Sequence, residues 1–173
     1  CFTILAAGIR PWGTSAPTNM NSGRPEEKIK QMGITIPEAA KPLAAYIPAL
    51  QVGNLVITSG QVPIADGNIV YAGKVGKDLS EDDARKAAEL CLINCLSVVK
   101  SIVGNLDNIK QIVKLTVFVN SAEGFTAQPK IANGASELLE KIFGENGKHV
   151  RSAVGVNELP LNSAVEIEMI VLV

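Results

Sequence analysis

The chain has 173 residues, which is enough for one domain with a well-filled core and leaves little for a second. Hydrophobic residues make up 47% of it, and 16 Lys and Arg nearly balance 17 Asp and Glu, which excludes general disorder and leaves no strongly basic surface for nucleic acid. No apolar run approaches the roughly 20 residues that span a bilayer, so neither a membrane nor nucleic acid is an expected partner.

Residues 1–34 are predicted to be an extension that precedes the compact domain, residues 35–173. The stretch 1–19 contains a single charge, Arg10, and lacks the periodic pattern of a core element. This acid-free segment weakly resembles an organellar transit peptide, but a disordered tail or an artificial addition accounts for it equally well. Three Cys cannot form a paired disulfide framework, so we expect a cytoplasmic protein, or a mitochondrial one if the extension targets it. A short helix is expected over residues 26–32.

The first part of the domain is expected to form short strands. Residues 45–50 and 55–59 are rich in strand-forming side chains, and the turn signal Gly53-Asn54 between them predicts a hairpin. A further short strand is expected near residues 69–71, after a second turn.

A strong helix is predicted to begin at Ser80 and to end at Gly104. Ser80 suits the N-cap, with Asp83 three residues on, and the acidic first turn suits the positive end of the helix dipole. Apolar residues recur at three- and four-residue steps and form one face of this helix: Ala84, Ala88, Cys91, Cys95, Val98 and Ile102.

The second half of the chain adds a strand, a helix and two more strands. Residues 112–119 alternate with period two, as a strand does. A second helix is expected over residues 126–143, where Pro129 is tolerated only because it falls in the first turn. The last two strands are expected over residues 150–156 and 164–173.

This order of elements predicts an α+β fold. Two helices can cover one face of a mixed sheet of four to six strands, and the other face then remains open. An open apolar face usually packs against another subunit, so the sheet alone predicts an oligomer.

Few residues suit a metal or cofactor site. Cys91 and Cys95 are four residues apart on the first helix, but they share its apolar face and no third and fourth ligands are evident, so we interpret them as packing residues. The only His, His149, falls in an expected loop and is interpreted as a solvated side chain, with a role at a subunit boundary as the alternative. We expect no metal and no organic cofactor.

The most informative residues for function are Arg151, at the start of one apolar strand, and Glu166 and Glu168, inside the next. If these two strands pair as a hairpin, Arg151 lies opposite Glu166 on one face. One interpretation is a surface ion pair that contributes little. The other is a partly buried guanidinium that clamps a substrate carboxylate, beside a Glu that orients or deprotonates a water molecule.

Three blocks of sequence occur in a fixed order. They are Gly-Asn-Leu-Val-Ile-Thr-Ser-Gly-Gln-Val-Pro at 53–63, Thr-Val-Phe-Val at 116–119, and Arg151-Ser152-x-Val154-x-Val156-x-x-Leu159-Pro160 followed by Val165-Glu166-Ile167-Glu168. Each block alone is weak, whereas the three in order are specific. Together they resemble the RidA/YjgF superfamily of reactive imine and enamine deaminases, also described as endoribonuclease L-PSP-like. The resemblance covers about residues 34–173.

The resemblance implies a chorismate-mutase-like α+β fold, assembled as a homotrimer with sites in clefts between subunits. It implies cofactor-free hydrolysis of 2-imino or 2-enamine acids, such as 2-aminoacrylate and its imine tautomer, to 2-keto acids and ammonia. In this scheme Arg151 binds the substrate carboxylate and Glu166 positions the attacking water. The other candidate substrate-binding residues are Tyr46, Ser59, Gly60 and Ala153.

Departures from the family pattern leave alternatives open. Pro129 stands where many members have an Asn in the second helix, and Asn133, one turn on, is a candidate substitute. Ala153 and Gly155 are smaller than the residues often found there, which predicts a wider pocket. These departures favour, as the alternative, a non-catalytic trimer that binds a small carboxylate or a partner protein. RNA cleavage, attached to some members, is disfavoured by the neutral charge and the single His.

Overall fold

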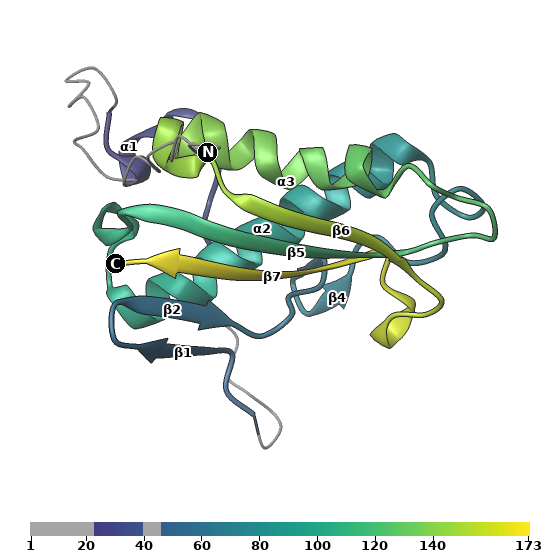
Figure 1. The fold of residues 1–173 in the computed structure, drawn as a ribbon, viewed down its shortest axis with the longest axis horizontal. Helices are drawn as coiled ribbons and strands as arrows, with labels where there is room; N and C mark the ends of the chain where they lie inside the picture. The colour runs from purple at the N-terminus through teal and green to yellow at the C-terminus, as the bar shows by residue number, and fades with distance from the viewer. Residues whose placement is uncertain (1–22, 40–45) are drawn as a thin grey trace, which may run out of the picture.

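The computed structural model describes residues 23–39 and 46–173 (Figure 1). The expectations for residues 1–22 lie outside the described residues. The helices are α1 (Pro25–Gln31), α2 (Glu81–Val103) and α3 (Gln128–Phe143), with short 3-10 turns at Leu106–Asn108, Gly144–Gly147 and Pro160–Asn162. None of the helices in the described part of the chain is long and apolar enough to cross a bilayer.

Five strands form the main sheet in the order β1-β2-β7-β5-β6. Their bounds are β1 (Ala49–Val52), β2 (Leu55–Thr58), β5 (Gln111–Asn120), β6 (Val150–Val156) and β7 (Val165–Leu172). Strand β6 runs parallel to β5, and the other neighbours are antiparallel. The sheet is therefore mixed, as predicted. A separate small hairpin joins β3 (Ile64–Ala65) and β4 (Asn68–Ile69), of which the sequence analysis expected only the second strand.

The ends of the two long helices are set by residues at or next to those ends. The Ser80 hydroxyl accepts a hydrogen bond from the Asp83 backbone N–H at 3.1 Å, which satisfies a donor that the first turn of α2 leaves free. Gly104 then takes a φ of 77°, a left-handed conformation that a glycine adopts at little cost. In α3, Pro129 lies in the first turn, where its missing N–H costs no helical hydrogen bond. The predicted ends of both helices are confirmed to within two residues. Ile102, which was predicted to share the apolar face of α2, is 40% exposed.

Both helices cover one face of the sheet, and the main core lies between these two layers (Figure 1). Along β7 every second residue is buried on this helix face, from Val165 to Val171. Cys91 and Cys95 are fully buried in α2, and their thiols donate to the carbonyls of Val165 and Ile167, both at 3.4 Å. Their interpretation as packing residues is confirmed, and burial raises the pKa of the Cys95 thiol to about 12.

The opposite face of the sheet, which we call the open face, has no covering layer in the described chain. The strand registers place alternate residues of neighbouring strands on it, because side chains alternate between the two faces. Several are apolar and exposed: Leu50, Val52, Ile57, Val150 and Val154. Exposed apolar side chains on a sheet face without a covering layer are typical of surfaces that associate with another chain.

The short helix α1 packs onto the domain. Its Ile29 is buried, and the Glu26 carboxylate accepts hydrogen bonds from Lys100 Nζ at 3.0 Å and from the Leu106 backbone N–H at 3.1 Å. These contacts pack α1 against the domain, which was expected to begin at residue 35.

The expected hairpin between the last two strands is wrong. Strand β5 lies between β6 and β7, so Arg151 pairs with Leu115 and Glu166 pairs with Phe118. The connecting segment, residues 157–164, is longer than the two to five residues usual for a hairpin. It can therefore cross two strand spacings, about 10 Å, and leave the centre of the sheet to the long strand β5.

Candidate functional site

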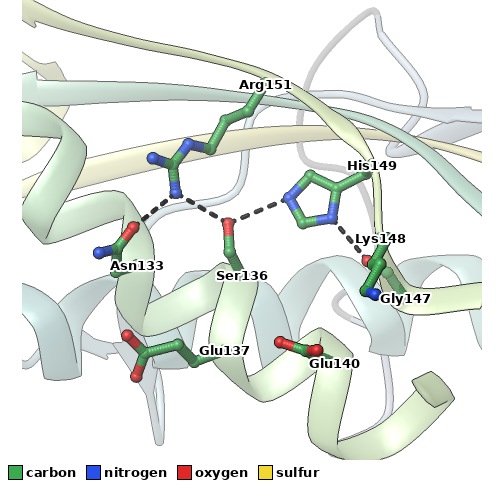
Figure 2. Close-up of a pocket in the computed structure, with 8 residues that line it drawn as sticks. All are labelled: Asn133, Ser136, Glu137, Glu140, Gly147, Lys148, His149 and Arg151. Atoms are coloured by element: carbon green, nitrogen blue, oxygen red, sulfur yellow. Dashed lines mark hydrogen bonds between the residues drawn. The ribbon is translucent and has the colours of Figure 1, made fainter. Parts of the chain in front are cut away.

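Arg151 extends from the edge strand β6 toward helix α3. Its partner on β5, Leu115, is fully buried, so both residues lie on the helix face of the sheet. Arg151 Nη1 donates to Asn133 Oδ1 at 3.0 Å and to Ser136 Oγ at 2.9 Å (Figure 2). Its Nη2 makes a longer contact of 3.3 Å to the carbonyl oxygen of Pro129. One nitrogen of the guanidinium is thus fully used to fix its orientation.

The other edge of the guanidinium is free to bind a ligand. Among the described residues, Arg151 Nε has no hydrogen-bond partner, and Nη2 has only the long contact to Pro129. These two nitrogens form the side of the guanidinium that can donate two parallel hydrogen bonds to one carboxylate. Arg151 is therefore held by α3 with a carboxylate-binding edge exposed.

Ser136 and His149 continue the hydrogen-bonded cluster beyond Arg151 (Figure 2). Ser136 Oγ lies 3.0 Å from His149 Nε2, and His149 Nδ1 lies 2.6 Å from the Gly147 carbonyl oxygen. A carbonyl can only accept, so the Nδ1 atom bears the proton of the neutral ring and Nε2 accepts the Ser136 hydroxyl. The interpretation of His149 as a solvated side chain is wrong.

Burial lowers the pKa of His149, and the positive charge of Arg151 lowers it further, although the hydrogen bond to Gly147 acts in the opposite direction. The neutral imidazole is therefore the form that this site favours. This agrees with the tautomer that the Gly147 carbonyl selects.

A cleft of about 390 Å³ lies beside these residues. All of its lining side chains are polar or charged, apart from one glycine: Asn133, Ser136, Glu137, Glu140, Gly147, Lys148, His149 and Arg151. Glu137 is engaged by Arg85 at 2.9 Å, and Lys148 is engaged by Glu145 at 2.8 Å. We call this the α3–β6 cleft. The part of the chain that the structure describes contains no group of three side chains that could hold a metal ion.

Glu166 lies on the open face, together with its partner Phe118 on β5. Its carboxylate passes directly over Gly60, and the Glu166 Cδ is 2.7 Å from the position that a Cβ on Gly60 would take. The segment that holds Gly60 is fixed to β7 by reciprocal backbone hydrogen bonds between Gln61 and Ile167, at 2.8 and 2.9 Å. Burial raises the pKa of Glu166, and the nearby Glu168 raises it further.

Arg151 and Glu166 consequently lie on opposite faces of the sheet in one chain. Their partners on β5, Leu115 and Phe118, are three residues apart, and an odd spacing along a strand reverses the face. The expectation that the two side chains meet across adjoining strands of one chain is wrong. Any site that uses both needs them from two copies of the chain.

The remaining predicted site residues are distributed between these two places. Ala153 follows Arg151 on the helix face and packs partly against the core. Ser59 lies next to Gly60, but its hydroxyl donates to the Ile47 carbonyl at 2.7 Å. Tyr46 is 62% exposed. The structure thus brings Gly60 and Glu166 together, whereas Tyr46 is a largely exposed side chain.

Asn133 lies one turn after Pro129 on α3. Its side chain contacts Arg151, while Pro129 contributes a backbone carbonyl. The sequence pointed to Asn133 but not to Ser136. His149 lies two residues before Arg151 and directly before strand β6, so extending the strand's alternation by one residue would place both side chains on one face.

A family model described as "YjgF/chorismate_mutase-like, putative endoribonuclease" matches residues 26–172. The chain belongs to the RidA/YjgF family. Among similar proteins, TCP17 of Trypanosoma cruzi is 40% identical over 151 residues, which are 87% of this chain and 94% of that protein. A 2-iminobutanoate/2-iminopropanoate deaminase of Dermatophagoides farinae is 32% identical, over 81% of this chain and 94% of its own.

A solved structure extends the likeness to the fold. The protein Atu1372 of Agrobacterium tumefaciens, described as of unknown function, is 42% identical, covers 86% of this chain and 92% of its own, and superposes with a TM-score of 0.81. The mixed α+β sheet with its helix layer is therefore a RidA/YjgF fold.

Proposed function

We propose that the protein hydrolyses reactive 2-imino or 2-enamine acids to 2-keto acids and ammonia, at sites formed between neighbouring copies of a homotrimer. The observation that supports this most is the Arg151 guanidinium, held by Asn133 and Ser136 with its Nε and Nη2 edge unoccupied. Membership of the RidA/YjgF family and the likeness to a named 2-iminobutanoate deaminase supply the reaction class.

Arg151 binds the substrate carboxylate in this proposal. Two parallel charge-assisted hydrogen bonds fix the carboxylate and so orient the adjacent imine carbon. Because α3 already holds the guanidinium, little conformational entropy is lost when the substrate binds.

Glu166 of a second copy positions the attacking water. The water oxygen bonds to the imine carbon and the nitrogen gains a proton, which gives a carbinolamine. The carbon–nitrogen bond then breaks as the hydroxyl proton leaves, and a 2-keto acid and ammonia are released. A carboxyl whose pKa is raised by burial, as that of Glu166 is, is suited to accept and return these protons.

Burial of the apolar residues on the open face favours assembly of the proposed trimer. The exposed apolar residues of this face, among them Ile57 and Val154, are buried if the open faces of three copies pack together. The edge strand β6 of one copy then approaches the segment of the next copy that holds Gly60 and Glu166. A shared site also accounts for their position on opposite faces within one chain.

An imine-hydrolysis assay tests the proposal. Imines are generated by an amino-acid oxidase, and the release of keto acid is followed with wild type and Arg151→Ala. We expect kcat/KM to fall roughly 100-fold or more, since hydrogen bonds to charged groups contribute about 1.5–3 kcal/mol each. Arg24→Ala is the matched control, because Arg24 is exposed and, among the described residues, forms ion pairs with Glu27 and Asp107 at a distance from this site. Equal rates for wild type and Arg151→Ala would remove the assignment.

A second candidate function is binding of a small carboxylate without turnover. It is favoured by the fact that one chain supplies the complete Arg151 clamp without Glu166. Calorimetry with 2-ketobutyrate distinguishes the two: tight binding together with no turnover of any imine supports the binding module.

A further inference from the structure

Ser136 differs from an ordinary helical serine in the partners of its hydroxyl. A serine inside a helix usually donates to a carbonyl of its own helix, as Ser101 does to Val98 at 2.7 Å. Among the described residues, Ser136 has two partners, and both lie on or next to β6 instead: His149 Nε2 and Arg151 Nη1. Its hydroxyl therefore faces the α3–β6 cleft (Figure 2).

These contacts fulfil the geometric requirements for an activated serine. The Ser136 hydroxyl donates to the unprotonated Nε2 of His149, and the Gly147 carbonyl holds the ring in that tautomer. The Arg151 guanidinium, 2.9 Å from Ser136 Oγ, stabilises negative charge as the hydroxyl loses its proton. One lone pair of Oγ remains free for bond formation.

The same cleft provides donors for a developing oxyanion. The Asn133 side chain accepts from Arg151 through Oδ1, and its Nδ2 has no hydrogen-bond partner among the described residues. The Arg151 Nε is likewise free within the described chain. A cleft of about 390 Å³ lined by polar side chains suits a small polar ester rather than a long apolar one.

We propose that Ser136 and His149 are the nucleophile and the general base of an acyl-transfer site that hydrolyses small polar carboxylic esters, an activity beyond the imine chemistry. Ser136 Oγ bonds to the ester carbonyl carbon, and its proton passes to His149 Nε2. The carbon–alkoxide bond breaks, and the alcohol leaves with that proton. Water then attacks the acyl group, giving its proton to His149, and the carboxylic acid departs as Ser136 regains its hydrogen.

The alternative is that Ser136 and His149 only anchor Arg151. An anchoring pair has no reason to react with an electrophile, whereas a nucleophile–base pair reacts in the folded wild-type protein. The two accounts are therefore separated without any variant.

The test is covalent labelling of the full-length protein by a fluorophosphonate probe. The Oγ–P bond forms as the P–F bond breaks, and the proton accepted by His149 leaves with fluoride. We expect one label per chain, at Ser136 by peptide mass mapping, together with hydrolysis of p-nitrophenyl acetate that the label abolishes. No label on folded wild type, or a label at another residue, would overturn the proposal.

Variants give the matched controls. Ser136→Ala should abolish labelling, and His149→Gln should slow it by about 100-fold or more, as expected for loss of a general base. Ser101→Ala, the ordinary helical serine, should label at the wild-type rate. Labelling of Ser136→Ala at the wild-type rate would contradict the proposal, and so would an unchanged rate in a folded His149→Gln.

The pH dependence provides a second readout. The labelling rate should rise with pH as His149 loses its proton, with a midpoint below that of an ordinary histidine, and His149→Gln should lack this step. The charged groups around His149 are Arg151 on β6, Glu137 and Glu140 on α3, and Glu145 and Lys148 in the preceding turn. A rate that does not change with pH in wild type would exclude His149 as the base.

Discussion

Gly60 sets the place of the Glu166 carboxylate. A Cβ at residue 60 would overlap the Glu166 side chain, whose Cδ lies 2.7 Å from that position. Since Glu166 is only half-buried, its side chain can rotate away at little cost in stability. We therefore expect Gly60→Ala to fold normally and to lose roughly tenfold or more in imine hydrolysis, because the carboxylate no longer positions the water.

Gly23→Ala is the control for this change, because the nearest side-chain atom to its Cβ is an ordinary 3.6 Å away. It should leave both the thermal midpoint and kcat/KM unchanged. Full activity in Gly60→Ala would show that the close approach of Glu166 to residue 60 has no catalytic purpose.

His149 should make stability depend on pH in a defined direction. Its folded-state pKa is lowered by burial and by Arg151, so the folded protein resists protonation. The stability that the neutral His149 contributes is fully present above its ordinary pKa of 6.5 and is lost as the pH falls below that value. We expect the thermal midpoint of wild type to fall between pH 7.5 and pH 5 by more than that of His149→Gln. Equal falls would contradict the lowered pKa.

At the scale of single residues, the sequence indicates which residues belong to a candidate site better than it indicates which residues they contact. Arg151, Glu166 and Gly60 are recognisable from the family blocks, and Asn133 from its helical spacing to Pro129. The Ser136–His149 contact was not predictable, because it joins a helix to the residue before a strand and depends on how α3 lies across β6. No pattern of neighbouring residues predicts how α3 lies relative to β6.

At the scale of elements, Gly134 governs the packing of α2 against α3. A Cβ on Gly134 would meet the Arg85 backbone, with the Arg85 carbonyl carbon at 3.1 Å, and backbone cannot rotate away. Gly→Ala inside a helix ordinarily stabilises it by about 1 kcal/mol. Here we expect Gly134→Ala to destabilise by about 1–3 kcal/mol, because the helices must separate.

Denaturant unfolding measures this change, with Ser101→Ala on the exposed part of α2 as the control for helix propensity. Ser101→Ala should be neutral or slightly stabilising. A stabilised Gly134→Ala would contradict the close approach of the two helices.

Helix ends and strand positions were predictable because they depend on neighbouring residues. Ser80, Gly104 and the period-two alternation of β5 are local signals, and the structure confirms them. The strand with which β6 pairs is not determined by neighbouring residues. Sequence order suggested a hairpin with β7, but the long connection let β5 take the central position, and this one difference moved Arg151 to the other face from Glu166.

At the scale of the whole molecule, the open face should hold the copies together. Val154 is 44% exposed on this face, and a charge there could not be buried without a large desolvation cost. We expect Val154→Glu to reduce the mass in solution from three chains to one and to abolish imine hydrolysis. Ile102→Glu, at the similarly exposed end of α2 (40%), should keep the trimer. A trimeric Val154→Glu would place the interface elsewhere.

In the proposed trimer, each site takes Arg151 from one copy and Glu166 from another. The most direct test mixes Arg151→Ala and Glu166→Gln chains, each inactive alone, by unfolding and refolding them together. In randomly mixed trimers about one site in four joins an intact Arg151 to an intact Glu166. We expect recovery of about a quarter of wild-type imine hydrolysis. No recovery in trimers that mass spectrometry shows to be mixed would contradict it.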